Sequence, residues 1–375
     1  MIIRRICYLG SVRNPHVRKF ANHFCQKNWD VHLITWKRPS DTCSLNLNVT
    51  IHYINIPPHN ILKLGSLIEI TKIIDRITPT ILHAHYISTF GVISAFYKMY
   101  HNEIPLILSA QGSDVLLPGY LPLFRIMGRK LLKIAVAEAD YIHVDGDDMT
   151  SVLKKLGVPD KKLKDICYGI DVDVFRPYIN GESMFRNLNY GYSPIIISTR
   201  NLKQIYDVES LIRAAPTVLN EVPNAKFIII GTGTEENTLK KLTRRLNLSN
   251  SVEFLGYISN IDLPKYLASS DIYVSTSLSD GGLATSTAEA MACGLPLVVT
   301  DFGDNSKWIN NEINGYLVPL KNPKILAEKI VLLLKDPDNR TLFGQRNREI
   351  AVDKLDLHKG MNKVEAIYEE LVNNK

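Results

Sequence analysis

The stretch SDGGLATSTAEAMACGLP, residues 279–296, decides the fold of this chain because its residues have the order of a strand-to-helix turn. Asp280 is followed by two glycines, which let a ligand approach the main chain closely. The hydroxyl-bearing run that begins at Thr285 predicts a helix start, whose unpaired N–H groups suit a diphosphate. Glu289 lies one turn further on the same helical face, where its carboxylate can accept hydrogen bonds from the vicinal hydroxyls of a ribose. The stretch therefore predicts a site for a sugar joined to phosphates, with an ordinary β-to-α turn of small residues as the alternative.

The rest of the chain repeats this strand-and-helix unit. Short apolar runs predict strands at residues 2–9, 30–36, 50–56, 80–87, 105–110, 140–145 and 165–169, and again at 194–199, 225–231, 251–256, 271–276, 295–300 and 314–319. Amphipathic runs predict helices at 16–27, 66–77, 123–139, 208–222, 235–246 and 324–334. This alternation is typical of parallel sheets covered on both faces. We therefore predict an α/β protein that binds its ligands in a cleft at the carboxyl ends of its strands.

A length of 375 residues indicates two domains of ordinary size. Residues 1–176 form the expected N-terminal domain and residues 194–355 the C-terminal one. Residues 177–193 are the expected linker, since proline and glycine interrupt the periodicity there. Residues 356–375 are expected to form a C-terminal helix that can pack back on the N-terminal domain.

Composition and charge limit the partners. Residues 1–176 hold 22 Lys and Arg against 15 Asp and Glu, a net charge of +7, while the remainder carries −1. This excess indicates an anionic partner such as phospholipid head groups, whereas no aromatic and basic platform supports nucleic acid. The five cysteines are never spaced as CxxC, and neither a membrane span nor a secretory signal is visible, so we expect a cytoplasmic protein.

Candidate ligand-binding residues of the N-terminal half follow its strands. Gly10 ends the first strand and lets the backbone approach a ligand, and His16 can present its imidazole to the cleft. The alternative is a loop glycine and an incidental capping histidine. Another strand runs into a polar turn that can bind a sugar or an acceptor, made of Gln111, Gly112 and Asp114; Ser113 or Asp114 can equally cap the next segment.

Two histidines of this half have the spacing of a strand face. His83 and His85 lie two residues apart, so a metal is conceivable. No third ligand accompanies them at a telling spacing, so packing or hydrogen bonding is the favoured interpretation and no metal is predicted.

In the C-terminal half, cationic and glycine residues follow the strands. Arg200 and Lys203 come after the strand at 194–199, where a guanidinium suits a diphosphate. Gly231 and Gly233 follow the next strand and are candidate donor-binding residues. Glu236 stands where a dinucleotide fingerprint needs a third glycine, which argues against hydride transfer.

A basic stripe marks one helix of the N-terminal half. Arg125, Arg129 and Lys133 recur every four residues beside Lys130, among apolar residues. Such a helix can lie on an anionic membrane surface, on the inner face of the membrane, although a solvated helix face is the usual explanation.

Together these residues resemble glycosyltransferase family 4, the glycosyl transferases group 1, over nearly the whole chain. The most specific pieces are EAMACGLPLVVTD at 289–301, GIDVDVFRP at 169–177, GTGTEENTLKKL at 231–242 and NGYLVP at 314–319. The resemblance implies the GT-B fold, in which two Rossmann-like domains face each other across a cleft. It also implies transfer of a sugar from a UDP-, GDP- or similar nucleotide sugar, with retention of the anomeric configuration and without a metal. No cofactor is expected. The acceptor is expected to be a glycan or a lipid-linked molecule.

The resemblance also implies roles for single residues. Glu289 should hold the donor ribose and Arg200 should neutralise the departing diphosphate. The distal phosphate should meet the backbone N–H groups of Ala284, Thr285 and Ser286, and Gly281 and Gly282 are further donor-binding candidates. The base should lie near Gly256 and Tyr257, and Gly10 should approach the donor from the opposite domain.

Three departures from the family pattern affect the catalytic residues. The family pairs two acids eight positions apart, but Gly281 stands eight before Glu289. Either the loop has one extra residue and Asp280 contacts the transferred sugar, or that acid is missing. The family has a lysine about five residues after the arginine, but Ile205 and Tyr206 occupy that region here. Lys203 is the candidate substitute.

In the third departure, Gln111 replaces a histidine, which removes proton transfer at that position. The departures leave two alternatives open: an inactive GT-B partner subunit that binds a nucleotide or glycan, and a sugar-nucleotide epimerase.

Overall fold

The computed structural model describes residues 4–38, 45–55, 64–112, 115, 122–177, 190–280 and 282–373. The chain divides into two compact units, one made of residues 1–166 and 361–375 and the other of residues 167–360. Each unit contains one sheet in which all strand pairs are parallel. The predicted α/β class with two doubly wound parallel sheets is therefore confirmed.

The sheet of the first unit has seven strands in the order β3-β2-β1-β4-β5-β6-β7. Their bounds are β1 (Arg5–Leu9), β2 (Asp30–Thr35), β3 (Thr50–Tyr53), β4 (Ile81–His85), β5 (Leu106–Ser109), β6 (Tyr141–Val144) and β7 (Leu163–Asp165). The helices are α1 (Pro15–Gln26), α2 (Leu64–Ile77), α3 (Val92–Lys98), α5 (Pro122–Glu138) and α6 (Asp147–Lys155), with short turns η1 (Ile87–Gly91) and η2 (Asp160–Lys162). The C-terminal helix α14 (Leu357–Asn373) belongs to this unit from Met361 onward.

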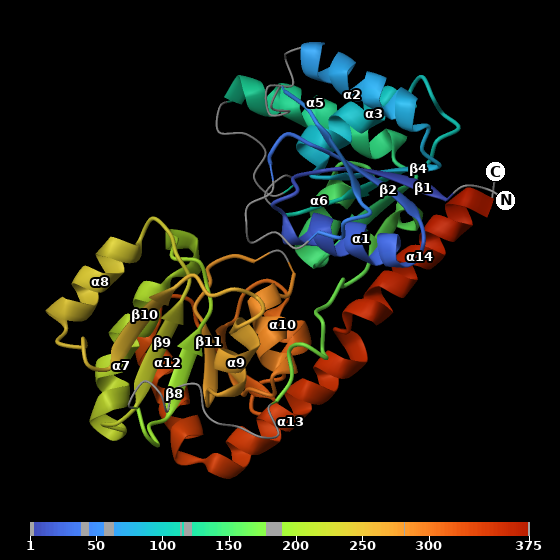
Figure 1. Ribbon diagram of the computed structural model, residues 1–375. Helices are drawn as coiled ribbons and strands as arrows, with labels where there is room; N and C mark the ends of the chain where they lie inside the picture. The colour runs from blue at the N-terminus through green and yellow to red at the C-terminus, as the bar shows by residue number, and fades with distance from the viewer. Residues whose placement is uncertain are drawn as a thin grey trace. The chain divides into compact units, whose positions relative to one another are not determined.

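Side chains alternate between the two faces of this sheet, as expected for strands. Cys7 and Leu9 belong to a core that also contains residues of α2, α3 and α5. Tyr8 points to the opposite face, where its ring meets Phe20 of α1. Figure 1 shows the same division, with α1 and α14 on one face and α2, α3 and α5 on the other.

A histidine joins the C-terminal helix to this sheet. One ring nitrogen of His83 hydrogen-bonds the hydroxyl of Tyr368 on α14, and the other lies 2.7 Å from Ser109 Oγ at the end of β5. Tyr368 is fully buried and stacks on Phe24 of α1 with ring centroids 4.6 Å apart. These contacts fix the last residues of the chain on the first unit.

The sheet of the second unit has six strands in the order β10-β9-β8-β11-β12-β13. Their bounds are β8 (Ile195–Ser198), β9 (Lys226–Ile230), β10 (Val252–Gly256), β11 (Ile272–Ser275), β12 (Leu297–Thr300) and β13 (Gly315–Val318). This unit also contains the turn η4 (Gln204–Tyr206) and the helices α7 (Val208–Glu221), α8 (Glu236–Arg245), α9 (Leu263–Ala268), α10 (Thr285–Ala292), α11 (Asn305–Trp308), α12 (Pro323–Lys335) and α13 (Pro337–Lys354). Two apolar clusters cover the two faces, one with α7, α8 and α12 and the other with α9, α10 and α13 (Figure 1).

Several helices begin at an Asn-Pro or Asp-Pro pair. Asn14 caps α1 by accepting from His16 N at 2.8 Å, and Asn322 and Asp336 cap α12 and α13 in the same way. A short polar side chain satisfies a free N–H group at each start, and the following proline has no N–H to satisfy. These dipeptides therefore determine where the helices begin.

One expected strand is misplaced. The run at 165–169 was expected to be a strand, but β7 ends at Asp165. Gly169 has a φ of +68°, and a Cβ there would lie 2.1 Å from the carbonyl oxygen of Leu355. Ile170 N then donates to that same oxygen at 2.7 Å. The chain leaves the first sheet at this point because it packs backbone to backbone against the segment before α14.

Candidate functional site

The centre of the site is Arg200, just beyond the end of β8. Its side chain is 8% exposed and forms an ion pair with Asp280 through Nη2. Nη1 donates to Ser286 Oγ at 2.9 Å and Nη2 to Ser277 Oγ at 3.3 Å. Because β8 and β11 are neighbours, the chain beyond the end of β11 reaches the guanidinium. The structure therefore brings Arg200 together with Asp280 and Ser286, which lie 80 and 86 residues further along the sequence.

The guanidinium in this cluster is charged. Burial is the largest single effect and lowers its pKa, but Asp280, Tyr273 and Tyr206 together outweigh burial, so the pKa of Arg200 is raised. The ring of Tyr206 covers the guanidinium face, with Cζ of Arg200 4.4 Å from the ring centroid. The site thus holds a permanent cation that is oriented from two sides.

The start of α10 forms the second wall of the site. Ala284 is the N-cap residue, and its side chain makes no cap hydrogen bond to the first turn. Ser286 Oγ also accepts from the hydroxyl of Tyr273 at 2.9 Å, in addition to Arg200. Burial raises the pKa of Tyr273, which keeps this hydroxyl protonated. With two donors already on its oxygen, Ser286 retains its own proton as a donor for a ligand.

Glu289 is buried at 8% exposure, one turn along α10. Burial and the nearby Glu289 carboxylate raise the pKa of the Cys293 thiol well above its usual range. Cys293 is therefore an unreactive core residue, and Glu289 is the acidic residue of α10.

Glycines fix the loop that carries Arg200. A Cβ on Gly231 would lie 2.4 Å from the Arg200 carbonyl oxygen, and one on Gly233 would lie 2.1 Å from that of Leu202. Leu202 N in turn donates to Thr232 O at 3.0 Å. Gly231 and Gly233 are therefore needed for backbone packing of this loop, which the sequence pattern did not reveal.

The residues expected near the base lie at the end of β10. Gly256 has a φ of +69°, and its carbonyl accepts from Gly231 N at 2.8 Å. Tyr257 is 60% exposed and Lys203 is exposed. Gly282 is buried with a φ of +77°, while Gly281 lies outside the described residues.

The expected residues of the N-terminal unit lie at the ends of β1 and β5. Gly10 follows β1, where a Cβ would lie 2.8 Å from Val17 and 3.4 Å from the Cβ of His85. His16 starts α1, and burial lowers its pKa to about 4. Gln111 is half-buried and Gly112 has a φ of +86°, while Asp114 lies outside the described residues.

The two histidines at strand spacing share one face of β4, with ring centroids 4.6 Å apart. Both are fully buried, and burial lowers the pKa of His85 to about 3. Across the described part of the chain, no three His, Cys, Asp or Glu residues gather as a metal site.

The basic stripe falls on α5. Arg129, Lys130 and Lys133 are exposed, whereas the side chain of Arg125 lies outside the described residues. None of the helices described is long and apolar enough to cross a bilayer.

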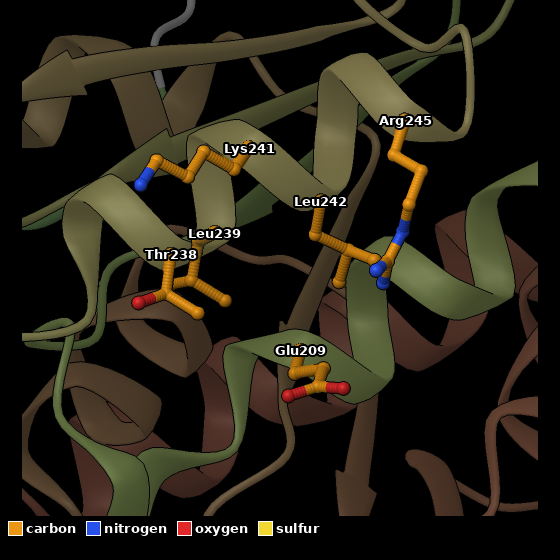
Figure 2. Close-up of a pocket in the computed structure, with 6 residues that line it drawn as sticks. All are labelled: Glu209, Thr238, Leu239, Lys241, Leu242 and Arg245. Carbon is orange, nitrogen blue, oxygen red and sulfur yellow. The ribbon is translucent and has the colours of Figure 1, made fainter.

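A pocket of about 390 Å³ lies elsewhere, between α7 and α8 (Figure 2). Leu239 and Leu242 point from α8 toward α7, where Glu209 lies. Glu209 already pairs with Arg213 at 2.6 Å. No residue of the predicted site lines this pocket, so it is separate from the Arg200 cluster.

Sequence reasoning missed three side chains of the cluster: Ser277, Tyr206 as a partner of Arg200, and Tyr273. Tyr273 reads as an ordinary core residue of a strand, and Ser277 follows that strand without a motif. Tyr206 was visible only as a departure from the expected lysine. Ser277 contacts Arg200 across 77 residues of sequence, whereas Tyr206 contacts it from the same loop.

Comparison with known proteins shows which family the chain is similar to. The family model for glycosyl transferases group 1 matches residues 180–350, and that for glycosyl transferase 4-like proteins matches residues 5–145. The N-acetyl-alpha-D-glucosaminyl L-malate synthase of Bacillus anthracis is 24% identical over 367 residues, which are 94% of this chain and 92% of that enzyme.

Two further proteins are similar to this chain. The N,N'-diacetylbacillosaminyl-diphospho-undecaprenol alpha-1,3-N-acetylgalactosaminyltransferase of Campylobacter jejuni is 28% identical over 265 residues, 68% of this chain and 66% of that enzyme. The structure of Anabaena HepE in complex with UDP-glucose matches with a TM-score of 0.78 at 17% identity, covering 98% of this chain and 99% of that one. The chain therefore belongs to the glycosyl transferases group 1 and is a glycosyltransferase of the GT-B fold.

Proposed function

We propose that the protein transfers a sugar from a nucleoside diphosphate sugar to a glycan or lipid-linked acceptor. The transfer retains the anomeric configuration and needs no metal. The observation that carries this proposal is the contact of Arg200 with Ser286 at the start of α10. A guanidinium and a helix start together offer charge and N–H donors to a diphosphate. The negative charge that develops on the leaving group is therefore stabilised in place, which is a large contribution to such a reaction.

Other residues of the second unit have proposed roles around the diphosphate. Glu289 binds the ribose hydroxyls, and Asp280 contacts the transferred sugar. Ser286 and the N–H groups from Ala284 to Ser286 bind the distal phosphate, with Lys203 nearby. Gly256 and Tyr257 receive the base, for which the 60% exposed ring of Tyr257 offers a stacking face.

The acceptor is proposed to bind to the N-terminal unit. Gly10, His16, Gln111, Gly112 and Asp114 follow strand ends there, where α/β sheets bind ligands. The chain has no proposed nucleophile, so the acceptor hydroxyl attacks on the face of the leaving diphosphate, and a phosphate oxygen takes its proton. No cofactor is proposed.

Relatives narrow the substrates to be tested first. HepE was solved with UDP-glucose, so UDP-sugars come first and GDP-sugars next. The Campylobacter relative acts on a diphospho-undecaprenol acceptor and the Bacillus relative on L-malate. We propose a lipid-linked or glycan acceptor because an exposed basic stripe on α5 suits an anionic membrane surface. The protein is then peripheral, on the cytoplasmic face.

The test is turnover with the purified full chain and a panel of UDP- and GDP-sugars. Release of nucleoside diphosphate, with and without lipid-diphosphate acceptors, is measured first, and NMR then gives the anomeric configuration of the product. We expect turnover with the sugars of either UDP or GDP. The anomeric configuration of the product should be the same as that of the donor. Tight binding of a nucleoside diphosphate without turnover across all acceptors would identify a binding subunit instead. Inversion of configuration would contradict the proposed chemistry.

A further inference from the structure

Tyr206 holds one face of the Arg200 guanidinium. Cζ of Arg200 lies 4.4 Å from the centroid of the Tyr206 ring, a distance typical of cation–π contacts. The ring belongs to η4, six residues after Arg200, and is half-buried. No other aromatic ring of the described chain has a cation–π contact with Arg200.

The backbone around Tyr206 is fixed to the chain that follows β11. The Tyr206 carbonyl accepts from Thr276 Oγ1 at 3.1 Å, and the Ile205 carbonyl accepts from Leu278 N at 2.8 Å. Tyr206 N also donates to Lys203 O at 2.9 Å. The backbone of η4 is therefore hydrogen-bonded to the loop that follows β11, which fixes the point from which the ring extends.

The edge of the guanidinium makes the hydrogen bonds of Arg200, whereas its face contacts Tyr206. Nη1 donates to Ser286, and Nη2 contacts Ser277 and Asp280. Nε is buried, and among the described residues it has no hydrogen-bond partner. A diphosphate that binds at Nη2 replaces Asp280, because both anions need the same donor. Tyr206 contacts the face of the guanidinium and not Nη2, so this exchange does not require that contact to break.

We propose that Tyr206 is a positioning residue for donor binding, which keeps both Nη atoms of Arg200 directed at the start of α10 while Asp280 gives way to the diphosphate. This role rests on the proposed function of the site. Tyr206 acts through Arg200, so we expect ligands that carry phosphate to depend on it and a nucleoside without phosphate not to. A flat aromatic face is sufficient for this task, and the phenol hydroxyl is not required.

The test compares Tyr206→Leu, which removes the aromatic face, with Tyr206→Phe, which keeps it. Dissociation constants for UDP, GDP, pyrophosphate and uridine are measured by calorimetry on the purified full chain. We expect Tyr206→Leu to weaken nucleoside diphosphate and pyrophosphate binding about tenfold, the range of a desolvated cation–π contact. Tyr206→Phe should bind within about twofold of the wild type, and uridine should bind all three proteins alike.

Tyr190→Leu is the matched control, because Lys226 lies over the Tyr190 ring at 5.5 Å in the same unit, away from the Arg200 cluster. It should leave nucleoside diphosphate binding unchanged. Tyr206→Gln replaces Tyr206→Leu if the latter melts below the assay temperature.

Equal binding of UDP by the wild type and Tyr206→Leu would overturn the role of Tyr206 and leave the proposed function standing. An equal loss for uridine and UDP would overturn it too, since that pattern indicates a general change of the pocket. If the wild type binds neither nucleoside diphosphates nor pyrophosphate, the donor site and the role of Tyr206 are both wrong.

Discussion

Asp280 and Arg200 form an ion pair in which neither side chain is freely solvated, with 16% of the Asp280 side chain and 8% of the Arg200 side chain exposed. The carboxylate occupies a donor position that a phosphate oxygen also needs. Asp280 therefore has two opposing effects on a donor, since it competes for Arg200 and is expected to contact the transferred sugar.

Asp280→Asn should separate these effects. Without the competing charge, we expect UDP to bind about three- to tenfold more tightly, because the Arg200 guanidinium is then free for the diphosphate. Turnover should fall at least about tenfold if the carboxylate contacts the sugar in the transition state. Calorimetry with UDP and initial rates with the best donor check both effects. Weaker UDP binding by Asp280→Asn would contradict the competition, and unchanged turnover would mean that the first acid of the family is missing from this chain.

Arg200→Ala and Glu289→Gln should each lower turnover well over about tenfold, the usual cost of losing a charge-stabilising or substrate-positioning group. Arg200→Ala removes the cation that receives the leaving diphosphate, and Glu289→Gln removes the negative charge and replaces one of the two oxygens that accept from the ribose hydroxyls with an NH2 donor. Initial rates at several donor concentrations check this. Arg213→Ala, on the exposed surface of α7, and Glu221→Gln, which lies opposite Lys335, serve as controls and should be unchanged. Near-normal kinetics in both site variants would remove the proposed donor site.

The sequence predicts the strands better than the helices. Runs such as residues 194–199 are continuous apolar stretches, and the structure places β8 within them. The helix Pro337–Lys354 was missed, because its apolar residues do not recur on one face and Asn347 is one of its buried positions. Asn347 is satisfied by the carbonyl oxygens of Leu295 and Asn314, which no local pattern of the sequence indicates.

For the candidate site, the sequence indicated single residues but not the contacts between them. Arg200 and Asp280 were both named from the sequence, because each follows a strand and strand ends carry ligands, and the structure places the two in contact. Their ion pair was not found, because it depends on β8 and β11 being neighbours, and strand order is decided by long-range packing. The glycines Gly231 and Gly233 looked like ligand-binding residues, whereas the structure adds a packing role for them beneath Arg200.

Gly233→Ala should displace the loop that carries Arg200. A Cβ there would lie 2.1 Å from the Leu202 carbonyl oxygen, which is backbone and cannot rotate away. We expect the free energy of unfolding of this unit to fall by about 1–3 kcal/mol, together with weaker UDP binding. Thermal unfolding and calorimetry measure the two effects. Gly128→Ala is the control, since a Cβ on this helical glycine has no neighbour within 4 Å and should be neutral or stabilising. Wild-type stability in Gly233→Ala would show that the loop adjusts without cost.

Buried histidines should make the first unit sensitive to acid. Burial lowers the pKa of His85 to about 3, with His16 and His143 adding to the effect, while the unfolded chain has an ordinary pKa of about 6.5. Between these values the unfolded state binds protons that the folded state does not, so stability falls as the pH falls. From pH 7 to 5 the loss is roughly 2 kcal/mol for such a histidine.

His85→Phe should therefore reduce the difference in melting temperature between pH 7 and pH 5 by several degrees, as measured by calorimetry. Phe suits the site because Tyr8 and Phe20 already surround the ring. His358→Phe, at an exposed position, should leave the difference as it is in the wild type. An unchanged pH dependence in His85→Phe would mean that this histidine is protonated in the folded state.

Reversal of charge on α5 should release the protein from anionic membranes. Arg129, Lys130 and Lys133 are exposed, and each cation near an anionic surface contributes about 1 kcal/mol to binding. Changing all three to Glu should therefore lower the fraction that floats with phosphatidylglycerol-containing vesicles at least about tenfold, with no effect on neutral vesicles. The control changes Lys241, Arg244 and Arg245 of α8 to Glu, an equal change in net charge on three exposed residues of the other unit. If both triple variants lose binding equally, the attraction comes from net charge rather than from α5, and if neither does, the basic stripe is an ordinary solvated helix face.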